Sequence, residues 1–186
     1  MKNKVLFEAA VKFGTPLYIY DSNMIKSQYN RLKQSFKDVK NLQINYAVKA
    51  LSNISILKYL INLGSGIDAV SIQEVKLALK AGVNPKKILY TPNGVSIEEI
   101  KEVSELGVSV NIDNLEVLEQ FGNLNPDIPV CIRINPHIMA GGNSKISVGH
   151  IDSKFGISIH QTPHILRIVE RSEEHTSELQ SPDHLV

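Results

Sequence analysis

A rhythm repeated five times between residues 42 and 134 constrains the fold most strongly. Each repeat begins with a short apolar run rich in β-branched residues, continues through a polar helix start and an amphipathic stretch, and ends near a glycine. Repeats roughly 20–25 residues long predict β/α units with right-handed crossovers and a parallel sheet. The predicted strands are Leu42–Val48, Gly66–Val70, Lys87–Tyr90, Val108–Ile112 and Val130–Ile134.

Local capping signals place the helices between these strands. Ser71 with Glu74, and Ser96 with Glu99, have the spacing of a capping box, in which a hydroxyl and a carboxylate satisfy the first free amides of a helix. Glycines at the expected ends supply the left-handed backbone that commonly terminates a helix. The predicted helices are Ser55–Leu63 up to Gly64, one from Ser71 to Gly82, one from Ser96 to Gly107, one from Asp113 to Gly122, and Thr162–Val169.

These units favour an α/β fold that is part of a (β/α)8 TIM barrel. A complete barrel of eight units takes about 250 residues, so about five units fit in this chain. A doubly wound open sheet is the alternative. No G-x-G-x-x-G motif follows the first strand, which weakens a dinucleotide-binding version of that alternative.

The segment before the first unit has its own character. Residues 1–21 are predicted to form a short helix and a strand, Pro16–Asp21 (PLYIYD), outside the barrel. Ser22–Phe36 then reads as a helix capped by Asp21 or Ser22. We therefore expect three regions: an N-terminal helix and strand (1–21), a partial barrel (22–170) and a tail (171–186).

The tail differs from the rest of the chain. Arg171–Ser181 reads RSEEHTSELQS, and this string back-translates to codons that resemble a widely used sequencing adapter. We interpret 171–186 as a translated artefact, and we expect the natural protein to continue past Glu170. A natural polar tail is the alternative.

Composition excludes several classes of function. Of 186 residues, 42% are hydrophobic and 21% charged, with a net charge of +1. These values are typical of globular proteins, and no basic block indicates a nucleic-acid partner. No apolar run reaches the roughly 18 residues of a membrane span, and the N-terminus is too polar for a signal peptide. A single cysteine, Cys131, fits a reducing cytoplasm.

Candidate site residues follow from barrel geometry, because active sites of such barrels lie at the carboxyl ends of the strands. Lys49 ends the first strand, where partial desolvation would favour the neutral amine that attacks carbonyl groups; a surface lysine is the alternative. Asp68 and Arg133 are charged residues within apolar strands. They either pair structurally or face the barrel mouth, where they would orient Lys49 or a ligand.

Other polar residues carry weaker signals. Asn135 and His137 follow the fifth strand and begin a long glycine-containing loop, which we interpret as lying near a substrate. The histidine spacings match no zinc motif, so no metal site is expected. Cys131, between Val130 and Ile132, is predicted to be a buried core residue.

A resemblance adds to these predictions. Tyr46–Gly64 (YAVKALSNISILKYLINLG) resembles the cofactor-attachment pattern of the fold-type III, pyridoxal-phosphate-dependent group-IV decarboxylases, which have an alanine-racemase-like barrel. This family includes ornithine, arginine and diaminopimelate decarboxylases. Phe13–Asp21 and Gly64–Val75 are similar to other family segments. Ile134–Ile157, with its K-F-G sequence, is most similar to the diaminopimelate branch.

The resemblance implies a cofactor, a reaction and residue roles. Lys49 would attach pyridoxal 5'-phosphate, and Asp68 and Arg133 would support it electrostatically. The implied activity is decarboxylation of an amino acid, meso-2,6-diaminopimelate, to L-lysine in a homodimeric cytoplasmic enzyme. Alternatives are an arginine-, ornithine- or carboxynorspermidine-type decarboxylase, or a non-catalytic pyridoxal-phosphate homeostasis barrel.

The resemblance also implies that essential parts lie outside these residues. Family members carry a ring-stacking histidine, a phosphate site and a C-terminal β-domain at later positions. We therefore expect the 186-residue chain by itself to be inactive.

Overall fold

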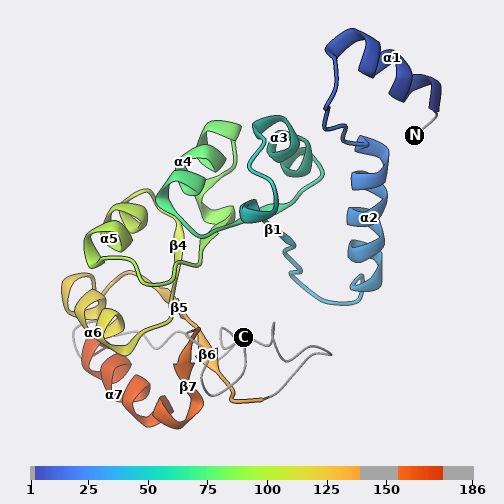
Figure 1. Ribbon diagram of the computed structural model, residues 1–186. Coiled ribbons are helices and arrows are strands. Elements are labelled where there is room, and N and C mark those ends of the chain that lie inside the picture. Colours follow the sequence, from blue (N-terminus) through green and yellow to red (C-terminus); the bar gives the residue numbers. More distant parts are fainter. Residues whose placement is uncertain (1–2, 139–154, 174–186) are drawn as a thin grey trace. The chain divides into compact units, whose positions relative to one another are not determined.

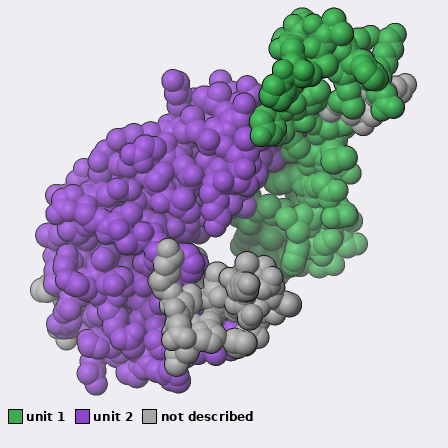
Figure 2. All heavy atoms as spheres, in the orientation of Figure 1, with its two compact units in different colours: residues 1–44 green, residues 45–186 purple. Residues whose placement is uncertain are grey.

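The computed structural model describes residues 3–138 and 155–173. The chain divides into two compact units, residues 1–44 and 45–186 (Figure 2). The sequence-based boundary at residue 22 differs from this division, because the helix that begins there belongs to the first unit.

The first unit consists of two helices, α1 (Asn3–Phe13) and α2 (Ser22–Ser35), neither of which has a buried residue. Asp21 caps α2 as predicted, since its Oδ1 accepts hydrogen bonds from the amides of Asn23 and Met24 at 3.0 and 3.3 Å. The bond from Met24 is the main reason that the pKa of the Asp21 carboxyl lies below its usual range.

The predicted strand Pro16–Asp21 is not formed. These residues lie between the two helices without strand pairing. A strand is stable only when its backbone groups pair with a neighbouring strand, and within the described ranges no segment pairs with this one.

The second unit contains the predicted parallel sheet. In the described part of the chain, five strands form this main sheet in the order of the sequence, with parallel pairing throughout. The strands agree with the predicted positions but are shorter. They are β1 (Asn45–Ala47), β2 (Gly66–Ala69), β3 (Ile88–Tyr90), β4 (Ser109–Ile112) and β5 (Val130–Ile132).

Helices connect successive strands and lie in a row along one side of the main sheet (Figure 1). A doubly wound sheet would carry helices on both faces, so this arrangement supports the partial barrel. The helices are α3 (Ile54–Asn62), α4 (Ile72–Ala81), α5 (Ile97–Glu105), α6 (Leu115–Leu124) and α7 (Thr162–Glu173). Short 3-10 helices are η1 (Val48–Ala50), η2 (Pro85–Lys87) and η4 (Ile159–Gln161).

The two faces of the main sheet differ in burial. On the three central strands, the outer face that the helices cover consists of side chains that are at most 1% exposed: Ile67, Ala69, Ile88, Tyr90, Val110 and Ile112. Residues between these positions point to the inner face and are half-buried or exposed: Asp68, Leu89, Ser109, Asn111 and Cys131. The core of the unit therefore lies between the outer face and the helices.

The predicted serine caps are confirmed, since Ser71 and Ser96 accept hydrogen bonds from the amides of Glu74 and Glu99. The carboxylates differ from the predicted capping boxes: Glu74 accepts from the amide of Val70, and Glu99 from that of Ile72. Gly82 ends α4 with a left-handed φ of 95°. Helices α3 and α6 begin differently from the prediction, because Asn53 and Asn114 cap them through their side-chain oxygens.

A small sheet follows β5. Strands β6 (Ile134–Asn135) and β7 (Ile157–Ser158) pair in parallel. They bring together the two ends of the loop, of which residues 139–154, including most of its glycine-containing part, lie outside the described residues.

Helix α7 continues past Glu170, where the predicted tail begins. Arg171 forms an ion pair with Glu119 of α6 at 2.6 Å, and residues 174–186 lie outside the described residues. The structure gives no support for an artificial origin of 171–186, which stays a prediction. No helix in the described ranges has the length and apolar character needed to cross a membrane.

Candidate functional site

Polar side chains gather where the strands of the main sheet end. In a parallel sheet all carboxyl ends meet at one edge, which is where barrels place their active sites. Register fixes the neighbours along this edge: Ala47 lies beside Asp68, and Asp68 beside Leu89. We call this edge the carboxyl rim and define it by Lys49, Asp68, Thr91, Asp113 and Arg133.

Lys49 lies in η1, two residues beyond Ala47, which is the register partner of Asp68. The sequence predicted that Lys49 lies at the end of the first strand, either partly desolvated or as a surface lysine. The strand ends two residues earlier, at Ala47, and Lys49 is exposed. Lys49 thus follows the strand in a 3-10 turn, and its side chain has no hydrogen bond or ion pair with another described residue.

Asp68 is half-buried on the inner face of β2 and has a close partner. The hydroxyl of Thr91, the residue after β3, donates a hydrogen bond of 2.5 Å to its Oδ1. The Thr91 amide also donates to the carbonyl of Ala69 at 2.7 Å. Two bonds therefore connect the end of β3 to β2.

Arg133 follows β5, and its guanidinium lies over the ring of Phe155 at 4.5 Å from the ring centre. A cation over an aromatic face is attracted by the negative charge of the ring surface. The backbone supports this contact, because the amide of Ile157 donates to the Arg133 carbonyl at 2.7 Å.

Gly156 allows this close approach. A Cβ at this position would lie 2.9 Å from the Asn135 amide nitrogen and 3.1 Å from the Arg133 carbonyl oxygen. Its φ of +82° also favours glycine. The K-F-G sequence therefore has a structural explanation: its aromatic ring contacts Arg133, and its glycine lets the two chain segments meet.

Asp68 and Arg133 do not form the structural ion pair that was one reading of the sequence. Two strands separate β2 from β5, which places them roughly 14 Å apart along the sheet. Within the described residues, Asp68 contacts Thr91 and Arg133 contacts Phe155. The side chains of Asp68 and Arg133 are therefore each held by an uncharged neighbour.

Asn135 and His137 belong to the small sheet and its continuation. Asn135 is buried, and its Oδ1 accepts a hydrogen bond from the His137 amide at 3.0 Å. His137 has a φ of +56°, and its ring contacts that of His160 edge to face at 5.1 Å. The Nδ1 atom of His137 is buried without a hydrogen-bond partner in the described structure. The role of both residues near a substrate stays a prediction.

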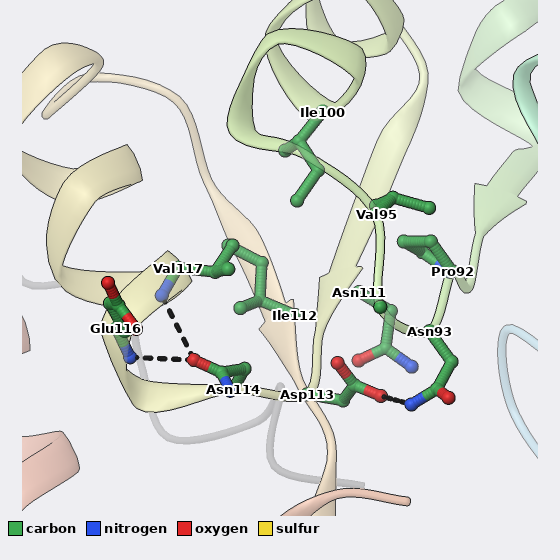
Figure 3. Close-up of a pocket in the computed structure, with 11 residues that line it drawn as sticks. Pro92, Asn93, Val95, Ile100, Asn111, Ile112, Asp113, Asn114, Glu116 and Val117 are labelled. Atoms are coloured by element: carbon green, nitrogen blue, oxygen red, sulfur yellow. Dashed lines mark hydrogen bonds between the residues drawn. The ribbon is translucent and has the colours of Figure 1, made fainter.

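A pocket of about 250 Å³ lies at the rim between β3 and β4 (Figure 3). Asn93 and Asp113 point toward one another in it, and the Asn93 amide donates to the Asp113 carboxylate at 2.7 Å. Asn111 lies beside this pair, and its Oδ1 is buried without a hydrogen-bond partner among the described residues. This wall of the rim is therefore polar.

Cys131 corrects a sequence prediction. It was expected in the core, but it pairs with Asn111 on the inner face and is exposed. Alternation along β5 turns its side chain away from the helices. Partial burial of its sulfur nevertheless raises the pKa of the Cys131 thiol.

Sequence reasoning missed two functional candidates, Thr91 and Phe155. Thr91 had a visible signal: it is the first polar residue after a buried strand, at the rim where Asp68 was already placed. Phe155 lies in the K-F-G sequence, but its contact with Arg133 depends on chain segments 22 residues apart and has no local signature.

Known proteins resemble this chain in sequence and fold. Diaminopimelate decarboxylases from Methanothermobacter thermautotrophicus and Campylobacter jejuni are 36% and 42% identical to it over 163 and 153 residues. The matches cover 87% and 80% of this chain. The chain spans 38% of the length of each of these relatives.

Solved structures agree. The chain superposes on diaminopimelate decarboxylase from Helicobacter pylori, in complex with L-lysine, with a TM-score of 0.80 and 35% identity, covering 92% of this chain and 44% of that one. The family model described as "pyridoxal-dependent decarboxylase, pyridoxal binding domain" matches residues 22–176. This match includes the main sheet and every residue of the carboxyl rim, so the chain belongs to the pyridoxal-dependent decarboxylase family.

Proposed function

We propose that the complete protein containing this chain decarboxylates meso-2,6-diaminopimelate to L-lysine. The observation that carries this proposal is the identity of 36–42% to proteins named diaminopimelate decarboxylase over most of this chain. The Helicobacter pylori relative was solved with L-lysine bound, which supports an amino acid as the ligand.

The carboxyl rim has groups that fit pyridoxal phosphate. Lys49 offers an exposed amine that forms no ion pair with a described residue. Asp68 offers a carboxylate whose Oδ1 is held by Thr91. This donor set suits a cofactor that carries an aldehyde, a basic nitrogen and acidic oxygens, so we propose that Lys49 attaches it. When bound, the cofactor supplies an electron sink for the carbanion formed on loss of carbon dioxide.

The residues of this chain would then act through position and charge. Lys49 Nζ would hold the cofactor covalently and would give up this position to the amine of the substrate. Asp68, one strand away, stabilises positive charge near that nitrogen. Arg133, fixed by Phe155, supplies a positive charge at the opposite end of the rim. The substrate loses one carboxylate as carbon dioxide and gains a proton on the same carbon.

Assembly and location are part of the proposal. The resemblance supports a homodimer, in which the rest of the protein would complete the site. A single cysteine, exposed on the inner face, supports work in the reducing cytoplasm.

A substrate panel on the complete protein loaded with pyridoxal phosphate tests this function. We expect carbon dioxide release from meso-diaminopimelate at least tenfold faster than from ornithine, arginine or carboxynorspermidine. Faster release from ornithine, arginine or carboxynorspermidine would identify that compound as the substrate instead. No carbon dioxide release from any of the four compounds would support a non-catalytic barrel.

Lys49→Ala tests the attachment site. We expect it to abolish both turnover and the visible absorbance of the attached cofactor, because no other amine would form the covalent link. Lys58→Ala, which removes an exposed lysine of α3, is the matched control and should retain both. Visible absorbance that persists in Lys49→Ala would refute Lys49 as the attachment residue.

The 186-residue chain alone should be inactive and prone to aggregate. In the described residues, β1 and β5 are the edge strands of the main sheet, and an edge strand can pair with another chain. Light scattering and the decarboxylation assay on this chain test the expectation. A monodisperse, active chain would contradict it.

A further inference from the structure

We propose that Thr91 is a positioning residue that fixes the carboxylate of Asp68 at the cofactor-binding rim. The inference rests on the proposed function, because it assigns Thr91 a role in that same site. Thr91 would act through Asp68 and would not itself touch substrate or cofactor.

The hydrogen bond between the two side chains joins the end of β3 to β2. Thr91 Oγ1 donates to Asp68 Oδ1 at 2.5 Å, and the residues are 23 positions apart in the sequence. Both are half-buried, so water competes less for the carboxylate than at an open surface. A hydrogen bond to a charged acceptor in such a place restricts the rotation of the acceptor.

The strand itself does not require this hydroxyl. The Thr91 amide already extends the sheet by donating to the Ala69 carbonyl at 2.7 Å. Valine has the same branched shape as threonine and is at least as favourable in a strand. Valine could therefore replace Thr91 as far as the sheet is concerned, and the hydroxyl has a role only in its bond to Asp68.

Fixing one oxygen of Asp68 has a consequence for the other. The bond from the β3 side restricts how the carboxylate can turn, and among the described residues no hydrogen bond to Oδ2 is found. On its other side, Asp68 is the register partner of Ala47, two residues before Lys49. The carboxylate therefore keeps one oxygen for a positively charged nitrogen at the rim.

Three variants of the complete, pyridoxal-phosphate-loaded protein test this role. Thr91→Val should lower kcat about tenfold with KM within twofold, and should slow the rise of visible absorbance when cofactor is added to the cofactor-free protein. Thr91→Ser keeps the hydroxyl and should stay within threefold of wild type. Ser109→Ala removes an exposed hydroxyl of β4 from the inner face, on which Asp68 also lies. It should change neither kcat nor the rate at which visible absorbance rises.

A double-mutant cycle separates positioning from a structural effect. If Thr91 acts through Asp68, then Thr91→Val should cause no further loss of kcat in an Asp68→Ala background. Urea unfolding should show that every single variant is folded, with a loss of about 1 kcal/mol for Thr91→Val from the missing hydrogen bond. Equal effects of Thr91→Val with and without Asp68 would overturn the proposal, as would a Thr91→Ser variant as impaired as Thr91→Val.

Failure of this inference is distinct from failure of the proposed function. If wild type binds the cofactor and turns over substrate, and Thr91→Val equals wild type, only the role of Thr91 is refuted. If wild type neither develops visible absorbance nor releases carbon dioxide, the proposed function fails and the role of Thr91 fails with it.

Discussion

The two faces of the main sheet show how one set of strands serves stability and chemistry separately. On the outer face, Ile67, Tyr90 and Ile112 are at most 1% exposed beneath the helices. On the inner face of the same strands, Asp68 and Asn111 are half-buried and Cys131 is exposed. Since neighbours in a strand point in opposite directions, a change of one position along the chain moves a residue from the core to the candidate site.

The largest expected effect on stability is at Ile112. Ile112→Ala should reduce the free energy of unfolding of the complete protein by about 2–5 kcal/mol, because it leaves a cavity between the outer face and the helices. Urea denaturation measures this loss. Cys131→Ala, on the inner face of the next strand, should change stability by less than about 0.5 kcal/mol. Similar losses of unfolding free energy for Ile112→Ala and Cys131→Ala would contradict the view that only the outer face contributes strongly to stability.

Gly156→Ala tests how the small sheet holds Arg133. The added Cβ would lie 2.9 Å from the Asn135 amide nitrogen, which is backbone and cannot move aside alone. We expect a loss of about 2–3 kcal/mol in stability and weaker cofactor binding as Arg133 shifts. Gly94→Ala is the matched control, because its φ is also positive but nothing lies within 4 Å. Gly94→Ala should reduce stability by only about 1 kcal/mol. Equal losses of stability for Gly94→Ala and Gly156→Ala would contradict the close contact between Gly156 and the Asn135 backbone.

Tyr90→Phe gives the smallest effect and one that depends on pH. The Tyr90 hydroxyl donates to Glu99 Oε1 at 2.5 Å, so the variant should lose about 1 kcal/mol at neutral pH. Burial, and then Glu99, raise the pKa of Tyr90 well above its ordinary value of 10.0. The unfolded wild type therefore ionises first as the pH rises, and the advantage over Tyr90→Phe should shrink above about pH 10. Unfolding both proteins at pH 7 and pH 10.5 measures this, and a constant difference would contradict it.

Features that depend on local chemistry could be predicted from the sequence. Ser71 and Ser96 cap helices because a hydroxyl at that position satisfies free amides of its own segment. The strands could be placed because buried parallel strands are continuously apolar. Lys49 could be assigned to the carboxyl rim because it follows such a strand.

Features that depend on partners far along the chain could not. The bond between Thr91 and Asp68 requires the register of two strands. Cys131 sits in an apolar run that does not reveal which face it occupies. The segment Pro16–Asp21 has the composition of a strand, but composition supplies no neighbour to pair with.

The order of the strands has a consequence for how the chain is made. Each strand of the main sheet pairs with the one synthesised just before it. A β/α unit leaving the ribosome therefore finds its docking edge already in place, and the sheet can grow in the direction of translation. Contacts formed in this way are short in sequence, which keeps the entropic barrier to each addition low. The part of the rim that carries Lys49 and Asp68 is therefore formed first, and Thr91 and Arg133 are added to it later in synthesis.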